Sequence, residues 1–139
     1  MRVISFKVPG LPHGKGRPRV AVRGGHARVY TPQKTASYES LVKMAGHMAM
    51  GEREPVVGPV YVVLTATFPI PASWSKKKQA EVRTGCMWHT GKPDADNIMK
   101  TMDALNGVVW KDDSQVALSK VQKLYGCNPG LDVLVEVLL

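Results

Sequence analysis

The chain has 139 residues, of which 44% are hydrophobic, and this is enough for one folded domain with a buried core. No apolar run approaches the roughly 20 residues of a transmembrane helix, and the first nine residues are too short and polar for a signal peptide, so no membrane partner is expected. The cysteines, Cys86 and Cys127, lack metal-ligand spacing, which favours a cytoplasmic chain with reduced thiols.

The net charge of +8 is unevenly distributed. Residues 1–50 carry nine Lys and Arg against one acid, whereas residues 101–139 carry three against five. A basic half beside an acidic segment is typical of a nuclease, in which one region holds phosphates and the other holds metal. Composition alone leaves open a basic protein with no nucleic-acid role.

The N-terminal part predicts a strand followed by a basic, glycine-rich segment. Residues 2–8 alternate between two faces, and residues 9–14 break the strand. Gly24-Gly25 predicts a hairpin turn into residues 27–30. Glycines let a backbone approach a ligand closely, and arginines offer bidentate donors to phosphate. We therefore predict contacts with the DNA backbone, against the alternative of a solvated loop, from Lys15, Arg17, Arg19, Arg23 and Arg28.

Thr31-Pro32 predicts the start of a helix that runs from about Gln33 to Met50. Helical spacing predicts that one stripe of this helix is buried. Its members are Tyr38, Leu41, Val42, Ala45, Met48 and Ala49.

The middle of the chain predicts a central strand over Val60 to Phe68, ended by Pro69 and Pro71. A short helix from Lys76 to Val82 follows. Three consecutive lysines usually form a solvated face, but Lys76 and Lys77 are also candidates for phosphate contacts. Later strands over residues 115–124 and 131–139 complete a single small α/β domain with a mixed sheet flanked by helices.

Five of the eleven acidic residues lie between positions 94 and 113. They surround a predicted amphipathic helix, in which Ile98, Met102 and Leu105 oppose a stripe of Asp96, Lys100 and Asp103. Asn106-Gly107 predicts the end of the helix because both residues tolerate left-handed backbone. Asp94 and Asp96 lie where the helix begins, so either can cap it.

This acidic stretch predicts a site for Mg²⁺ or Mn²⁺ that hydrolyses phosphodiesters. On an extended segment, Asp94 and Asp96 project from the same face. The third carboxylate then comes from Asp112 or Asp113, and Lys100 either stabilises charge on the phosphate or orients the attacking water. Asp-x-Asp also occurs in helix caps and calcium loops, Asp112-Asp113 can be a simple turn, and Asp103 can be a surface partner of Lys100. His89 is a metal or substrate ligand, or more commonly only a hydrogen-bonding residue.

The same residues resemble the RusA family of Holliday-junction resolvases. The resemblance rests on residues 92–97, Lys100, residues 103–107 and 110–115, and extends to residues 15–19, 30–32 and 71–77. It implies a RusA-like homodimer from a bacterium or its phage that cuts four-way DNA by paired nicks with Mg²⁺ or Mn²⁺ and no organic cofactor. It also implies metal ligands at Asp94, Asp96 and Asp113, an essential Lys100 and a lesser role for Asp112. As a surface residue of the helix, Asp103 is predicted to be a bystander.

A two-fold symmetric junction needs two symmetric cuts, and a C2 homodimer supplies two identical sites. The sequence leaves two other functions open. One is a branched-DNA-binding protein without catalysis, whose acids only cap a helix. The other is a metal nuclease that acts on forks, flaps or linear duplex.

Overall fold

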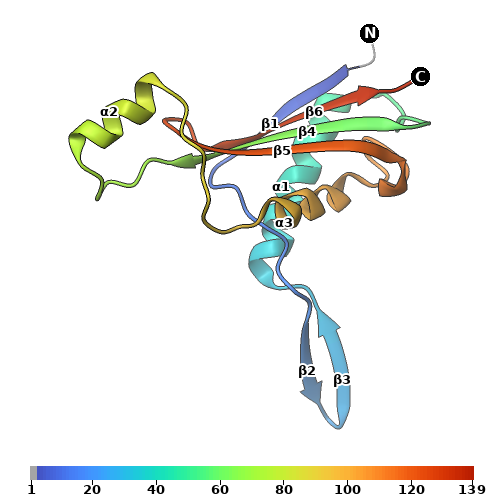
Figure 1. The fold of residues 1–139 in the computed structure, drawn as a ribbon. Coiled ribbons are helices and arrows are strands. Elements are labelled where there is room, and N and C mark those ends of the chain that lie inside the picture. The colour runs from blue at the N-terminus through green and yellow to red at the C-terminus, as the bar shows by residue number, and fades with distance from the viewer. Residues whose placement is uncertain (1–2) are drawn as a thin grey trace.

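The computed structural model describes residues 3–139, so the predicted first strand is assessed from Val3 onward and Arg2 lies outside the described residues. A four-stranded sheet has the order β1-β6-β4-β5 (Figure 1). Its strands are β1 (Val3–Pro9), β6 (Gly130–Val137), β4 (Val60–Pro69) and β5 (Val116–Gly126). β4 pairs parallel with β5 and antiparallel with β6, which confirms both the mixed sheet and the internal position of this strand.

The helices lie on one face of the sheet. Alternate residues of β4 from Val60 to Phe68 are buried on that face, whereas those between them are half-buried. The covering elements are α1 (Gln33–Met50), α3 (Ala95–Lys100) and the 3-10 helix η1 (Thr101–Leu105), and α2 (Lys76–Thr84) lies beyond the end of the sheet (Figure 1). The predicted flanking of the sheet by helices therefore holds for one face only.

The predicted bounds of α1 are confirmed, but its predicted buried stripe is wrong at Leu41 and Met48, which are exposed. Gly46 explains the rotation of the helix. A Cβ atom at Gly46 would lie 2.7 Å from Cδ2 of Leu105, so the glycine lets α1 approach η1 closely. This contact turns Val42, Gly46 and Met50 inward.

The predicted hairpin is confirmed as β2 (Arg19–Arg23) and β3 (His26–Tyr30). Gly24 and Gly25 adopt φ angles of 56° and 78°, which match the tight turns that favour glycine. The hairpin extends away from the body of the molecule, and all of its strand residues are exposed (Figure 1). We call residues 19–30 the arm.

Within residues 3–139, no helix has the length and apolar content needed to cross a membrane. Cys86 and Cys127 are both exposed and are not bonded to each other.

Candidate active site

Asp94 and Asp96 begin the site at the start of α3. Asp94 is the N-cap residue, but its side chain makes no capping hydrogen bond, so the predicted capping contact is wrong and its carboxylate is uncommitted. The helix starts directly after Asp94, and Asp96 lies in its first turn. The two residues therefore do not share an extended segment, and the prediction that they project from one face by strand alternation is wrong.

The helical stripes are placed largely as predicted. Ile98, Met102 and Leu105 are fully buried against the sheet and α1. On the exposed side, Nζ of Lys100 lies 3.8 Å from a carboxylate oxygen of Asp96. The predicted pairing of Lys100 with Asp103 is wrong, because Asp103 pairs with Lys15 from the segment between β1 and β2, which we call the basic loop.

The turn after η1 returns the chain toward the site. Gly107 has a φ of 79°, whereas Asn106 keeps an extended backbone, so only the glycine uses the left-handed conformation. Asn106 accepts a hydrogen bond of 2.7 Å from the indole Nε1 of Trp110. Val108, Val109 and Trp110 are buried, and they anchor the segment that delivers the second acidic pair.

Asp112 and Asp113 have different surroundings. Asp112 caps the 3-10 helix η2 (Asp113–Gln115) and accepts a hydrogen bond of 3.0 Å from the backbone N–H of Ser114. The Ser114 side chain and backbone lower the pKa of Asp112. The carboxylate of Asp112 is therefore used as a cap, which favours Asp113 as the acid that serves the site.

Gln115 is a supporting residue that the sequence prediction missed. Its Oε1 accepts from the backbone N–H groups of Lys111 and Asp112, at 2.9 and 3.1 Å. Its Nε2 donates to the carbonyls of Val56 and Gly58. The Asp112-x-x-Gln115 spacing is that of a capping box and could have revealed this role.

Asp113 lies beside Asp103 of η1. Both line a depression of about 180 Å³ together with Lys100. The pKa of Asp113 is raised, chiefly because its protonated form hydrogen-bonds the Asp103 carboxylate, with further effects of burial and of the charges of Asp103 and Asp112. Asp103 is thus part of the arrangement, although we predict it to be a bystander from the sequence.

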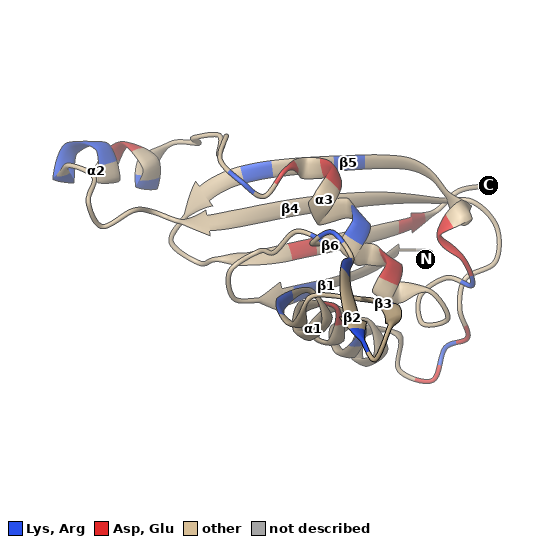
Figure 2. Cartoon of the chain, turned by 90° about the horizontal axis from the view of Figure 1, so that it is seen from below, with Lys and Arg blue, Asp and Glu red and all other residues tan. Residues whose placement is uncertain are grey.

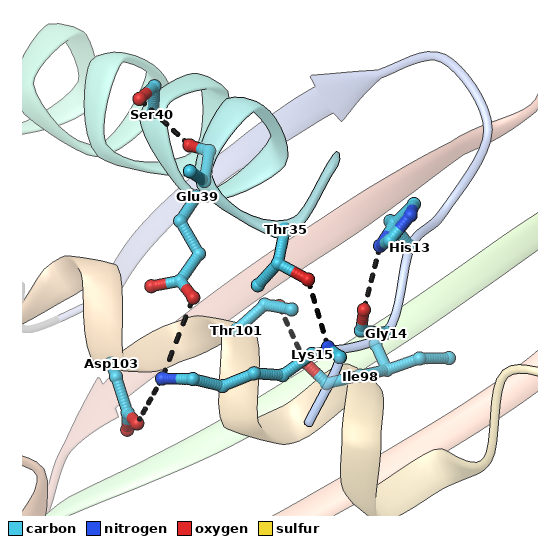
Figure 3. Close-up of polar contacts among 11 residues, drawn as sticks. His13, Gly14, Lys15, Thr35, Glu39, Ser40, Ile98, Thr101 and Asp103 are labelled. Carbon is cyan, nitrogen blue, oxygen red and sulfur yellow. Dashed lines mark hydrogen bonds and ion pairs between the residues drawn. The ribbon is translucent and has the colours of Figure 1, made fainter. Parts of the chain in front are cut away.

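Lys15 links the basic loop to this pair of acids. Its Nζ lies 3.2 Å from Asp103 and 3.5 Å from Glu39 of α1 (Figure 3). Its backbone N–H donates to the carbonyl of Asn97 at 2.8 Å. Burial lowers the pKa of Lys15, but the two carboxylates outweigh this effect and raise it. The ammonium group that we predict to bind phosphate is therefore already paired within the chain.

A larger depression of about 560 Å³ is lined by Lys15, and its lining also includes Arg17, Lys92, Asp94 and Asn97. Gly14 also lines it, and a Cβ atom there would lie 2.7 Å from Cβ of Pro93. This glycine allows close packing within the chain, rather than the approach to a ligand that we predict from the sequence. Asp94 and Asp113 consequently face different depressions.

The carboxylate oxygens of the site are ligands of the kind that a hard divalent cation prefers, but in the described part of the chain no group of three such side chains is in place. Among residues 3–139, no three Asp, Glu, His or Cys side chains are close enough together to hold a metal ion. The assignment of Asp94, Asp96 and Asp113 to one metal site therefore stays a prediction. The Asp103–Asp113 pair still supplies carboxylate oxygens, and Mg²⁺ commonly uses one or two carboxylates and several waters.

The other predicted DNA contacts fall on two separate surfaces. Arg17, Arg19, Arg23 and Arg28 are exposed on the arm and its base, without ion-pair partners in the described part of the chain. Lys76 and Lys77 are exposed on α2, well apart from the arm (Figure 2).

His89 packs with aromatic residues away from the acids. Its ring stacks on Phe68 at a centroid distance of 3.7 Å and meets Tyr125 edge-on. Burial and the charge of Lys123 lower the pKa of His89. These contacts favour a packing role over metal binding.

Asp103→Asn is expected to lower the pKa of Asp113 toward its ordinary value of 3.8, because the neighbouring carboxylate is removed. A carboxyl with a raised pKa stabilises the fold below its unfolded pKa, and this contribution is lost as pH rises through the folded value. The variant should therefore show a smaller loss of stability as pH rises above 3.8. Carbon-13 NMR titration of the Asp113 carboxyl checks the shift, and an unchanged pKa contradicts the pairing.

Comparison with known proteins covers almost the whole chain. A family model described as "Endodeoxyribonuclease RusA" matches residues 9–136, which include the basic loop, the arm and both acidic pairs. A Bacillus subtilis (strain 168) protein, "Uncharacterized protein YqaN", is 36% identical over 139 residues, which cover 98% of this chain and 97% of that protein.

Proposed function

Because this chain belongs to the RusA family of endodeoxyribonucleases, we propose that it is a metal-dependent endonuclease that resolves Holliday junctions by paired symmetric nicks. The observation that carries the site assignment is the difference in surroundings between the neighbouring acids Asp112 and Asp113. Asp112 is held as a helix cap, which leaves Asp113 beside a second carboxylate and Lys100 in an open depression.

Asp94, Asp96 and Asp113 are the proposed ligands of Mg²⁺ or Mn²⁺, and Asp103 is an additional candidate because it contacts Asp113. The side chain of Asp94 makes no capping bond that metal binding would have to break. These carboxylates would hold the divalent ion, which would supply Lewis-acid chemistry to the phosphoryl group and favour ionisation of a water.

The chain's own groups supply the remaining parts of the proposed mechanism. Lys100 lies between Asp96 and the depression that holds Asp113, where its positive charge can stabilise negative charge that develops on a phosphate. The exposed arginines of the arm are positioned to hold the DNA backbone through bidentate contacts.

Asp96→Asn tests this assignment. The amide keeps the shape of the side chain but loses its charge, so junction cleavage should fall by at least about 10²-fold while junction binding is retained. Gel-based cleavage and a binding titration measure the two effects separately. Asp132→Asn, at an exposed position on β6, is the matched control and should cleave normally. Normal cleavage by Asp96→Asn would make the assignment wrong.

A further inference from the structure

Lys15 is fixed to the body of the molecule through its backbone. Its N–H donates to the carbonyl of Asn97 in α3 at 2.8 Å, and the N–H of the next residue, Gly16, donates to Oγ1 of Thr35 in α1 at 2.9 Å. A Cβ atom at Gly16 would lie 3.0 Å from that same hydroxyl oxygen, so the chain passes close to α1. The backbone of this lysine is therefore held between two helices, unlike that of a lysine in a solvated loop.

The side chain of Lys15 joins α1 to η1. Its Nζ lies 3.2 Å from a carboxylate oxygen of Asp103 and 3.5 Å from one of Glu39 (Figure 3). The side chains of Lys15, Asp103 and Glu39 are 29%, 39% and 20% exposed. Ion pairs between fully exposed side chains contribute little because water and salt screen them, whereas partly buried pairs are screened less. Two carboxylates therefore hold this ammonium group in a defined place.

Asp103 carries this contact into the candidate active site. It lines the depression of about 180 Å³ together with Lys100 and Asp113, and its carboxylate contacts that of Asp113. Neighbouring carboxylates repel each other, so positive charge close to the pair favours their staying together. Lys15 supplies such a charge to Asp103, and Glu39 keeps the ammonium group in place.

We propose that Lys15 is a positioning residue of the nuclease site: held by Glu39, its ammonium group fixes the carboxylate of Asp103 beside that of Asp113. Among the described residues, the lining of the smaller depression includes neither Lys15 nor Glu39, so both act through Asp103. The inference rests on the proposed nuclease function. A displacement of about 1 Å at a reacting group can slow a reaction by about 10²-fold, so loss of Lys15 should slow the chemical step.

The surroundings of Lys15 argue against the phosphate contact that we predict for it from the sequence. A phosphate would meet an ammonium group already paired with two carboxylates, and Asp103 and Glu39 would repel it. Arg17 is the better phosphate ligand of the basic loop, because it is exposed and has no ion-pair partner within residues 3–139. Its guanidinium group also offers two donors to one phosphate. Lys15 and Arg17 thus have different roles, the first within the chain and the second toward DNA.

Single-turnover cleavage of a four-way junction by Lys15→Met, at saturating protein and Mg²⁺, tests the inference. The rate should fall by about 10- to 10²-fold, while the dissociation constant for the junction stays close to that of the wild-type chain. Lys15→Arg keeps a positive charge between the two carboxylates and should restore most of the rate. Lys7→Met removes a charge from an exposed position on β1, so it is the matched control and should cleave normally. Circular dichroism should show an unchanged fold for all three variants.

A phosphate contact at Lys15 would give the opposite pattern. Loss of one such contact weakens junction binding and lowers the slope of log K against log salt by about one, but it leaves the rate at saturating protein unchanged. That pattern would overturn the inference. Normal binding and normal cleavage by a folded Lys15→Met chain would also overturn it.

A double-mutant cycle tests the part assigned to Glu39. Glu39→Gln should slow cleavage as Lys15→Met does, although Glu39 lines neither depression. The chain with both substitutions should be no slower than Lys15→Met alone, because the two residues act through one contact. Rate losses that multiply in the double variant would show independent effects and would overturn the proposed coupling.

A crystal structure of Lys15→Met, determined without metal, separates this inference from the proposed function because it requires no cleavage. The carboxylate of Asp103 should be displaced from its contact with Asp113, and an unmoved carboxylate would overturn the positioning role. If the wild-type chain cuts no junction, the proposed nuclease function fails, and the position of Asp103 in the variant still decides the role of Lys15. If the wild-type chain and Lys15→Met cut equally well, only the positioning role fails.

Discussion

Asp113→Asn is expected to reduce cleavage of a four-way junction by at least about 10²-fold, whereas Asp112→Asn should leave most of the activity. Asp113 lies in the depression with Asp103 and Lys100, but the carboxylate of Asp112 is occupied by the backbone of Ser114. Single-turnover cleavage with saturating Mg²⁺ separates the chemical step from binding and compares the two neighbours directly.

The thermal stability of the two variants should follow the opposite order, with Asp112→Asn less stable than Asp113→Asn. Loss of the Asp112 cap should lower the thermal midpoint, because the amide is a weaker partner for the η2 backbone. Asp113→Asn should leave the midpoint unchanged or raise it, since it removes a carboxylate from beside Asp103. If Asp112→Asn abolished cleavage and Asp113→Asn did not, the roles assigned to these two acids would be exchanged.

Trp110→Ala is expected to lower the free energy of unfolding by about 3–5 kcal/mol, a large share of the about 5–15 kcal/mol typical of a domain. The indole is completely buried in the core and donates to Asn106 at 2.7 Å. Its loss leaves a cavity and removes an anchor of the turn that carries Asp113. Urea denaturation followed by circular dichroism measures the change.

Trp88→Ala is the matched control, because Trp88 is exposed and takes part in the sheet through its backbone. Its effect on the free energy of unfolding should stay within about 0.5 kcal/mol. Similar losses for the two tryptophans would show that Trp110 is not the specific anchor of this segment.

Much of the fold is predictable from the sequence, because the clearest sequence patterns each lie within one helix, strand or turn. The alternation in β4, the Thr31-Pro32 start of α1 and the Gly24-Gly25 turn all depend on neighbouring residues, and the structure has each element at its predicted place. The same applies to the buried side of α3 and η1.

The missed features depend on contacts between distant segments. Lys15 and Asp103 are 88 positions apart, so no local spacing predicts their ion pair. The rotation of α1 follows from the approach of Gly46 to Leu105, and hydrophobicity alone could not tell the core-facing stripe from the outer one. Leu41 and Met48 are apolar residues at exposed positions of this helix.

The acidic site was only partly predictable for a related reason. The sequence indicates which segment carries the carboxylates, but the residues alone leave Asp112 and Asp113 open as the third ligand. The Asp112-x-x-Gln115 spacing, whose capping box the structure shows, is the missed signal that separates the two acids. The sequence allows both a helix start and an extended segment at Asp94, and the start of α3 directly after Asp94 removes the strand geometry predicted for Asp94 and Asp96. The placement of Asp94 and Asp113 in the linings of different depressions is a tertiary property of the chain.

The central claim is that this protein is a metal-dependent nuclease for four-way junctions. The most direct measurement is cleavage of a junction, a fork, a flap and a linear duplex of shared sequence by the purified protein, with Mg²⁺ or Mn²⁺ and with a chelator. We expect paired symmetric nicks in the junction only when metal is present, and little cutting of the linear duplex. Equal cutting of all four substrates, or tight salt-sensitive junction binding without any nicking, would contradict the claim.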